Sequence, residues 1–237
     1  MKVIKTSNYK EMSSLAARLF LTQIQIKKHP VIALPTGSTP LGLYEELIKY
    51  HKECNKSYAN IITFNLDEYY PIKKEDSNSY YQFMMKNFFN HVDIKKENIF
   101  IPNGECSDPV KEAKEYEQKI KNHKGIDLAI LGIGVNGHIG FNEPGTLIDE
   151  THLTDISSST ARENSRFFNN ILEVPTQAIT MGMKTIASAE KIIILANGSK
   201  KMDIVDKISK GNIDENYPVT LLNNHKNATL IYTPYER

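Results

Sequence analysis

The sequence has no tryptophan, only two cysteines and no long apolar run among its 237 residues. Cys54 and Cys106 lie far apart and lack the close spacing of zinc ligands, so we expect neither a disulfide framework nor a metal site. No apolar stretch reaches membrane-spanning length, and Met1–Met12 lacks the apolar core of a signal peptide. These absences predict a cytoplasmic protein in a reducing compartment, with no membrane partner.

An excess of one charge is also absent. The chain has 29 Lys and Arg residues against 28 Asp and Glu residues, which gives a formal net charge of +1. Nucleic-acid-binding proteins usually show a basic excess, so we expect no nucleic-acid partner, while a local basic pocket for a small anion stays compatible with this balance. Hydrophobic residues make up 40% of the chain and charged residues 24%, which is typical of a globular protein with an apolar core.

Short apolar runs alternate with helical patterns along the whole chain, without a linker or an internal repeat. The runs that predict strands are 1–5, 31–34, 61–66, 99–101, 126–131, 191–196 and 228–232, and 178–188 predicts a strand passing into a helix. Helical patterns occupy 9–28, 44–52, 77–90 and 108–122. The alternation predicts a single, Rossmann-like α/β domain over residues 1–237, with a doubly wound, mostly parallel sheet and helices on both faces.

The first glycine-containing turn, Gly37-Ser38-Thr39, follows the strand predicted at 31–34 and precedes a helix. A helix N-terminus presents free backbone N–H groups and a partial positive charge, and the two hydroxyls add further donors. The turn therefore suits a phosphate group, although it lacks the lysine of a Walker loop. Plain N-capping of the helix by Ser38 or Thr39 explains the same residues equally well.

Two adjacent acids, Asp67 and Glu68, follow the apolar run 61–66. The carboxyl end of a buried strand is where α/β proteins build their sites, and neighbouring side chains on an extended chain point in different directions. We therefore expect at most one of the two carboxylates to face a site. The alternative is a solvated acid that begins a turn before Pro71.

The stretch Leu131–Gly145 concentrates more functional groups than any other. An apolar strand breaks there into a glycine-rich loop that carries Asn136, His138 and Glu143. His can shuttle protons near neutral pH and Glu can accept or orient them, so the loop predicts proton-transfer chemistry. The alternative is a tight turn whose polar side chains only satisfy backbone groups. The glycines of the loop match the dinucleotide fingerprint G-x-G-x-x-G, but the loop opens no helix, so we expect no nicotinamide cofactor.

Two later segments add further polar groups. Residues 146–175 are rich in Ser, Thr and Asn and include Arg162 and Arg166, and a long polar connection of this kind is often an active-site lid. Lys200 and Lys201 stand at the start of a helix, where their charge opposes the helix dipole unless an anion lies between them. The turns of a parallel sheet open at one edge, so the predicted topology brings all these groups together.

Six blocks of the sequence resemble the glucosamine-6-phosphate deaminases: LPTGSTPLGLY, TFNLDEYY, LGIGVNGHIGFNEPG, ENSRFF, ITMGMKTI and GSKK. They follow the order of that family between about residue 31 and residue 201. The resemblance implies conversion of glucosamine 6-phosphate to fructose 6-phosphate and ammonia, by aldose–ketose isomerisation coupled to deamination. It implies a small-molecule sugar phosphate as the substrate, and no metal or organic cofactor.

The resemblance also implies a role for individual residues. Asp67 matches the base that takes the proton from C2 of the open-chain sugar and returns one at C1. His138 matches the acid/base of ring opening, and Glu143 matches the carboxylate that assists it. The positions that match the phosphate site are Gly37, Ser38, Thr39, Arg166 and Lys201.

The chain departs from the longer members of that family at two places. Asn136 stands where they have Asp, and a neutral amide cannot stabilise an imidazolium as a carboxylate does. It can still fix the orientation of the ring by hydrogen bonding, so Asn136 stays among the expected catalytic residues. The sequence ends at Arg237, before the segment that helps to form an activator site, which argues against activation by N-acetylglucosamine 6-phosphate and favours a monomer or small homo-oligomer.

Two other functions stay open at this level. A 6-phosphogluconolactonase-like hydrolase would share the fold and the phosphate end, but it needs no base to abstract a C–H proton. A non-catalytic sugar-phosphate sensor would normally carry a DNA-binding segment, and residues 1–30 show one helix without a helix-turn-helix pair.

Overall fold

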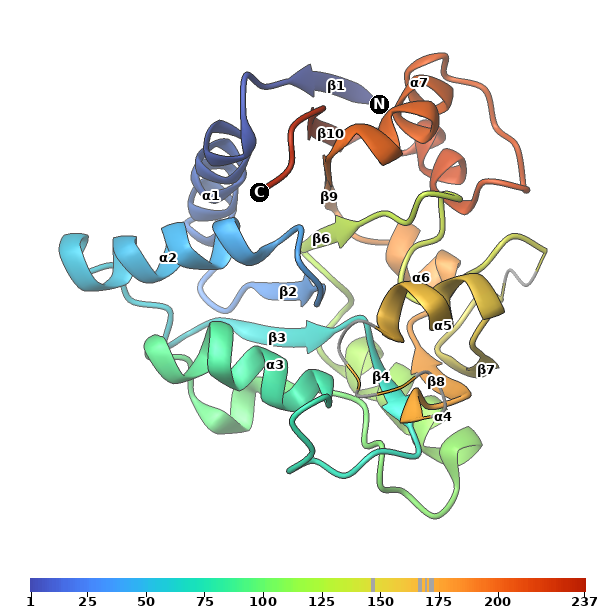
Figure 1. The fold of residues 1–237 in the computed structure, drawn as a ribbon. Helices are drawn as coiled ribbons and strands as arrows, with labels where there is room; N and C mark the ends of the chain where they lie inside the picture. Colours follow the sequence, from blue (N-terminus) through green and yellow to red (C-terminus); the bar gives the residue numbers. More distant parts are fainter. Residues whose placement is uncertain (146–147, 166–167, 169, 171–172) are drawn as a thin grey trace.

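The computed structural model describes residues 1–145, 148–165, 168, 170 and 173–237. Within these residues, seven parallel strands form a central sheet in the order β1-β10-β9-β6-β2-β3-β5 (Figure 1). The strands are β1 (Lys2–Lys5), β2 (Val31–Leu34), β3 (Ile62–Asn65), β5 (Ile99–Phe100), β6 (Leu128–Gly132), β9 (Lys191–Asn197) and β10 (Ala228–Thr233). The prediction of a doubly wound, mostly parallel sheet is confirmed.

Helices cover both faces of this sheet. The helices on one face are α1 (Tyr9–Ile24), α2 (Leu41–Cys54) and α3 (Tyr80–Asn87), of which α1 and α2 lie side by side in Figure 1. The helices on the other face are α4 (Pro109–Asn122), α6 (Met183–Ala187), α7 (Met202–Ser209) and the 3₁₀ helix η6 (Pro218–Asn224). The shorter elements are η1 (Phe89–His91), η2 (Lys96–Asn98), α5 (Ser158–Asn164) and η5 (Ser199–Lys201). No helix in the described part of the chain is long and apolar enough to cross a membrane.

The strand β2 shows why the sequence folds in this way. All four of its residues are buried, with Val31 and Ala33 in the apolar cluster beside α4 and Ile32 and Leu34 in the cluster beside α1. Successive side chains of a strand point to opposite faces of the sheet. A strand with helices on both sides therefore needs an apolar residue at every position, which is the pattern that made it visible in the sequence.

A second, antiparallel sheet lies beside the first and was not predicted. It has the order β4-β8-β7, and its strands are β4 (Asp67–Tyr70), β8 (Gln177–Thr180) and β7 (His152–Asp155). The apolar run of β3 therefore leads through Leu66 into another strand, and not into a turn. Tyr69 packs against Phe141 and Ala178, and this small apolar cluster gives β4 a buried side of its own. The polar connection predicted at 146–175 contains β7 and α5, so part of it is regular structure.

The strand order changes direction at β2. From β2 the chain continues to β3 and β5 on one side, while β6, β9 and β10 lie on the other. The carboxyl ends of β2 and β6 therefore border a crevice, and α/β proteins of this topology bind their ligands at such a place.

Candidate active site

A cavity of about 590 Å³ opens at the carboxyl ends of β2, β3, β6 and β9. Its volume lies in the range of small-molecule binding sites. The residues of its wall that the sequence singled out are Gly37, Ser38, Thr39, Asp67, His138 and Lys201. These groups come from four separate stretches of the chain, and the topology of the sheet brings them to one place.

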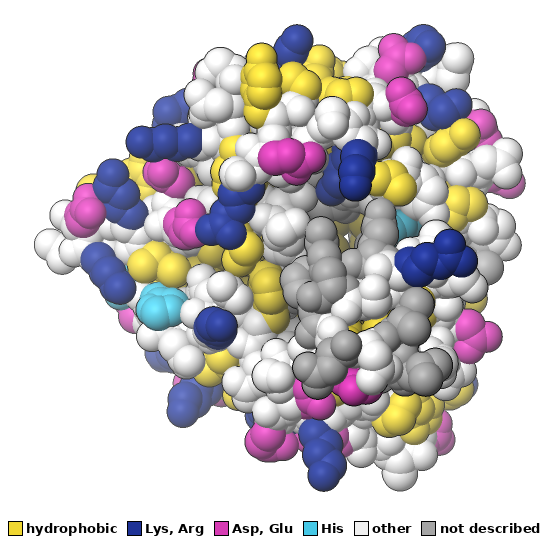
Figure 2. Space-filling view, viewed as in Figure 1, with side chains coloured by type: hydrophobic (Ala, Val, Ile, Leu, Met, Phe, Trp, Pro, Cys, Tyr) yellow, Lys and Arg dark blue, Asp and Glu magenta, His cyan; other side chains and the backbone are white. Residues whose placement is uncertain are grey.

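Charged residues line the cavity, and the visible surface around it carries charges of both signs (Figure 2). On the visible part of the face drawn in Figure 2, Lys and Arg side chains are interspersed with Asp and Glu side chains and form no single basic surface. The cavity itself is lined by the cations Arg162, Lys200 and Lys201 and by the acids Asp67 and Glu236. Among the described residues, no group of three or more His, Cys, Asp or Glu side chains is arranged to hold a metal ion.

The turn after β2 forms one end of the cavity. Gly37 has a φ of +93°, a conformation that favours glycine. Thr39 is buried, its hydroxyl donates to Asn197 Oδ1 at 2.8 Å, and Lys201 Nζ donates to Thr39 Oγ1 at 3.3 Å. These contacts join the turn after β2 to the turn after β9. The N-cap of α2 is Pro40, without a side-chain cap, so the alternative of plain capping by Ser38 or Thr39 is wrong.

The structure adds residues to this end of the cavity that the sequence did not reveal. Asn197 is the last residue of β9, and a polar residue directly after an apolar strand was a signal that could have found it. Glu236 gave no such signal, because it reaches the cavity from the segment after β10. Its carboxylate lies against Gly198, where a Cβ atom would come within 2.3 Å of Oε1. Arg166 lies outside the described residues, so its place in the site stays a prediction.

Asp67 is the first residue of β4 and pairs with Thr180 of β8. It is only 6% exposed and lines the cavity. No hydrogen bond from another described residue reaches its carboxylate. Burial raises the pKa of Asp67 from 3.8 to about 8, and the charge of Glu68 adds to the rise. A carboxyl group whose pKa lies near physiological pH can both accept a proton and return it.

Glu68 points away from the cavity. Its Oε1 accepts from the backbone N–H groups of Tyr69 at 2.9 Å and Tyr80 at 2.8 Å, and its Oε2 accepts from the N–H of Tyr81 at 2.9 Å. Tyr80 and Tyr81 begin α3, whose first N–H groups have no partner within the helix. Glu68 therefore holds the start of α3, and of the two adjacent acids only Asp67 lines the cavity, as the sequence predicted.

His138 is held by Asn136 and Glu143, two other polar residues of the loop after β6. Its Nδ1 lies 2.8 Å from Asn136 Oδ1, and the backbone N–H of His138 donates to the same oxygen at 3.2 Å. The Asn136 amide nitrogen in turn donates to Glu143 Oε2 at 2.8 Å, and that oxygen lies 3.7 Å from His138 Nδ1. The alternative in which these side chains only satisfy backbone groups is therefore wrong.

The ring of His138 packs directly over Gly134. A Cβ atom at position 134 would come within 2.2 Å of the ring, so only glycine leaves room for this orientation. The glycine pattern that resembles a dinucleotide fingerprint thus has a different use. The loop after β6 opens no helix, as the sequence indicated. Its second glycine, Gly134, leaves room for the imidazole ring of His138.

Glu143 has the same exposed fraction as Asp67, but its carboxylate has several hydrogen-bond donors. It accepts from the hydroxyls of Ser157, at 2.8 Å, and Thr160, as well as from the amide of Asn136. Burial alone would raise the pKa of Glu143, but the charge of His138 and these hydrogen bonds outweigh it, so that the pKa is lowered. Glu143 therefore stays ionised at neutral pH.

Comparison with known proteins places this arrangement among sugar-phosphate enzymes. The model of the family described as glucosamine-6-phosphate isomerases/6-phosphogluconolactonase matches residues 7–231. A glucosamine-6-phosphate deaminase of Clostridium novyi is 51% identical over 232 residues, which are 98% of this chain and 96% of the relative. The deaminase of Oceanobacillus iheyensis is 48% identical over the same share of this chain and 93% of its own.

Solved structures agree with these relatives. A structure described as a monomeric glucosamine-6-phosphate deaminase superposes with a TM-score of 0.96 at 41% identity, over 98% of this chain and 97% of the other. The 6-phosphogluconolactonase of Thermotoga maritima superposes with a TM-score of 0.77 at 20% identity, over 98% of both chains. At that lower identity the likeness shows the fold alone.

Proposed function

This chain belongs to the glucosamine-6-phosphate deaminase family, and we propose that its cavity converts glucosamine 6-phosphate to fructose 6-phosphate and ammonia. The protein is an enzyme of amino-sugar metabolism. One observation carries the assignment at the level of the site. A single cavity combines the proton-accepting carboxyl group of Asp67, the oriented imidazole of His138 and an oxyanion-binding turn at Thr39 and Lys201.

The phosphate group of the sugar binds at the end formed by the turns after β2 and β9. Backbone N–H groups after Gly37, the hydroxyls of Ser38 and Thr39, and the ammonium of Lys201 supply its donors. We assign Arg166 to the same site by its match to the family. The phosphate is remote from the reacting carbons, so its binding energy serves to orient them.

His138 opens the sugar ring. The Asn136 amide nitrogen donates to Glu143, so Oδ1 of Asn136 faces His138. This oxygen accepts a hydrogen bond from Nδ1 of His138, which therefore carries the proton. This tautomer leaves Nε2 to take the proton of the anomeric hydroxyl and to give one to the ring oxygen. The ionised Glu143 stabilises the imidazolium that exists between these two transfers.

Asp67 then moves the proton that isomerises the open-chain sugar. It takes the proton from C2 and returns one at C1, while one proton of the amine passes to the C1 oxygen, which leaves a hydroxyl at C1 and an imine at C2. Water adds to the imine carbon and ammonia leaves, so that the reaction consumes one water and releases one ammonia. A base whose pKa is about 8 suits this step, because proton transfer is most effective when the pKa lies near the working pH.

The matches favour this activity over the two alternatives. The relatives at 48% to 51% identity are deaminases, whereas the lactonase structure is 20% identical. A lactonase also has no use for a buried base beside the substrate carbons. A sensor without turnover would not need a histidine held in one orientation by two further polar groups.

Three finer assignments belong to the same proposal. We infer that the enzyme acts as a monomer, as the structural relative at 41% identity does, and mass measurement by light scattering tests this. We place it in the cytoplasm, where its two cysteines, which form no disulfide, stay reduced. We also propose that the segment at 146–175 acts as a lid, because α5 within it supplies Arg162 and Asn164 to the cavity wall.

The decisive experiment measures ammonia and fructose 6-phosphate released from glucosamine 6-phosphate, with and without N-acetylglucosamine 6-phosphate. We expect the two products in equal amounts, and hyperbolic kinetics that the acetylated sugar does not change. Asp67→Asn should lower kcat by roughly 10³-fold, the scale of general-base catalysis, and should still bind the substrate through its phosphate.

Asp206→Asn is the matched control, because Asp206 is an exposed acid on α7 that pairs with Lys210. It should behave as the unsubstituted enzyme. Near-normal turnover in Asp67→Asn would contradict the assignment of the base. Hydrolysis of 6-phosphogluconolactone without release of ammonia from the amino sugar would contradict the function itself.

A further inference from the structure

The carboxylate of Glu143 joins two segments of the chain. Its Oε2 accepts from the amide of Asn136, in the loop after β6 that also carries His138. Its Oε1 accepts from the hydroxyls of Ser157 and Thr160, which belong to the start of α5. One buried carboxylate thus links the helix that covers the cavity to the histidine within it.

The helix α5 controls more than one contact. Ser157 is its N-cap and accepts from the backbone N–H of Thr160 at 3.2 Å, so both hydroxyls belong to the first turn. Thr160 itself lines the cavity, as do Arg162 and Asn164 further along the helix. A displacement of α5 would therefore change the cavity wall and remove two donors of Glu143, the hydroxyls of Ser157 and Thr160, in the same movement.

The amide of Asn136 makes this link directional. An amide has a donor end and an acceptor end, and it can rotate by half a turn to exchange them. While Glu143 is ionised and in place, it accepts from Nδ2 and leaves Oδ1 for His138. Without that acceptor, the backbone N–H of His138, which donates to Oδ1 at 3.2 Å, still opposes rotation of the amide. A rotated amide would turn Nδ2 toward the ring, which would require His138 to carry its proton on Nε2. A Nε2–H ring cannot take the proton of the anomeric hydroxyl.

We propose that Ser157 and Thr160 are positioning residues: by holding Glu143, they fix the amide of Asn136 and hence the tautomer of His138. This rests on the proposed function, because it assigns ring opening to His138. His138 can then open the sugar ring when α5 lies over the cavity, because only then do the two hydroxyls hold Glu143. Asn136 is a neutral amide, so the charge of Glu143 acts on the histidine partly through a neutral group. The hydroxyls of Ser157 and Thr160, which hold Glu143 in place, are more important for that reason.

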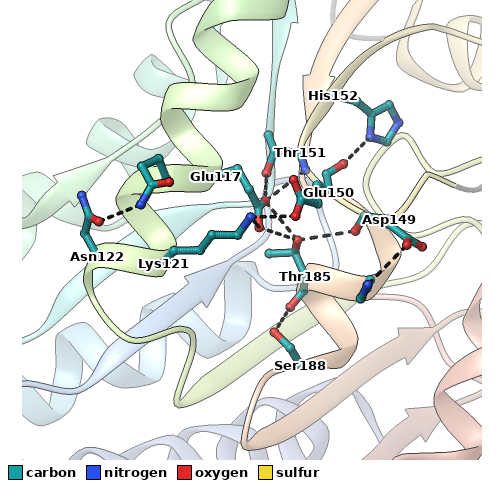
Figure 3. A network of polar contacts seen from close by, with 11 residues as sticks. Glu117, Lys121, Asn122, Asp149, Glu150, Thr151, His152, Thr185 and Ser188 are labelled. Carbon is teal, nitrogen blue, oxygen red and sulfur yellow. Dashed lines mark hydrogen bonds and ion pairs between the residues drawn. The ribbon is translucent and has the colours of Figure 1, made fainter.

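A second buried carboxylate, that of Glu117, accepts from threonine hydroxyls in the same way but lies outside the cavity. Glu117 of α4 accepts from the backbone N–H and hydroxyl of Thr151, at 3.0 and 2.6 Å, and from the hydroxyl of Thr185 (Figure 3). Lys121 and Glu150 form an ion pair beside it. None of these residues lines the cavity, and together they anchor the chain before β7 to α4 and α6. The chain is therefore held in place just before β7, the strand that precedes α5.

The test compares two losses of one hydroxyl from a buried carboxylate. Thr160→Val should lower kcat/KM for glucosamine 6-phosphate about tenfold, the effect of one hydrogen bond to a charged group. It should leave unchanged the affinity for 2-amino-2-deoxyglucitol 6-phosphate, an open-chain polyol that has no ring to open. Thr160→Ser, which keeps the hydroxyl, should restore activity. Ser157→Ala is a second variant of the same kind, should Thr160→Val fold poorly.

The imidazole tautomer is a readout that does not depend on turnover. In protein labelled with ¹⁵N-histidine, the signals that His138→Gln removes should report Nδ1–H in the unsubstituted enzyme and a mixture of tautomers in Thr160→Val. Thr185→Val, the matched control, should lower the melting temperature without changing kcat/KM or these signals. If Thr160→Val only lowers the melting temperature, as the control does, the positioning role is wrong. Absence of ammonia release by the unsubstituted enzyme would refute the function instead.

Discussion

Asp67 and Glu143 are two carboxyl groups of one site with the same exposed fraction, 6%. Their pKa values nevertheless move in opposite directions: that of Asp67 rises to about 8, and that of Glu143 falls. Burial acts on both by disfavouring the charged form. What differs is the surroundings, because Asp67 has a neighbouring acid and no hydrogen-bond donor among the described residues, while Glu143 faces His138 and accepts from an amide and two hydroxyls.

The difference shows how one cavity can hold both a base and a permanent anion. A catalytic base must gain and lose its proton during turnover, which requires a charged form that the site does not over-stabilise. A group that orients an imidazole must keep its charge, which requires donors that bind the ionised form. The hydrogen-bond donors around Glu143, together with the deeper burial of the Asp67 carboxyl group, assign the two roles.

Removing the charge from the second carboxylate should have the largest effect on activity after that of Asp67→Asn. Glu143→Gln keeps the shape of the side chain but cannot stabilise an imidazolium, so kcat/KM should fall by roughly 10²-fold. The ammonia assay measures this loss. Asp206→Asn serves again as an exposed control. A loss below about threefold would mean that Asn136 alone orients His138, and the contrast between the two carboxylates would have no catalytic consequence.

The pH dependence of kcat/KM should report mainly the first carboxylate, although burial also raises the pKa of its neighbour Glu68, to about 7. Asp67 is active when ionised, so kcat/KM should rise about tenfold per pH unit below about pH 8 and level off above it. Glu143, with its lowered pKa, stays ionised over that range and adds no limb near neutrality. A flat profile between about pH 6 and pH 8 would show that Asp67 ionises at its ordinary pKa.

As the pH rises towards 8, the stability of the protein should fall while its activity rises. The folded state raises the pKa of Asp67, so it holds a proton that the unfolded chain has lost, and ionisation of Asp67 costs stability as the pH rises from 3.8 towards 8. Asp67→Asn removes this cost. We expect it to raise the free energy of unfolding by about 2 kcal/mol above pH 8 and by little below pH 4. Urea unfolding at the two pH values checks this, and a variant equally stabilised at both would contradict it.

Much of this site could be predicted because its signals are local. The loop that carries Asn136 and His138 follows an apolar strand, and a parallel topology brings the ends of such strands together. The expectation that at most one of two adjacent acids faces the site also needed only the alternation of side chains.

The remaining features depend on contacts between distant parts of the chain. β4 is a strand because β8 pairs with it, and no pattern within the four residues DEYY indicates that partner. The hydroxyls of Ser157 and Thr160 lie in a polar segment where many Ser and Thr residues look alike. Only the folded structure shows which of them reach Glu143. Glu236 likewise reaches the cavity through the path of the chain after β10.

The smallest expected effect separates the two causes of the raised pKa of Asp67. Burial is the larger cause and the charge of Glu68 the smaller one, so Glu68→Gln should leave most of the shift in place. The glutamine oxygen can still accept from Tyr69 and Tyr80, which keeps the start of α3 attached, although the contact with Tyr81 is lost. We therefore expect the rise of kcat/KM to move to lower pH by less than about one unit, because a like charge that disfavoured ionisation has gone. A melting curve controls for loosening of α3. A shift to higher pH would mean that Glu68 acts on Asp67 through the packing of α3, and not through its charge.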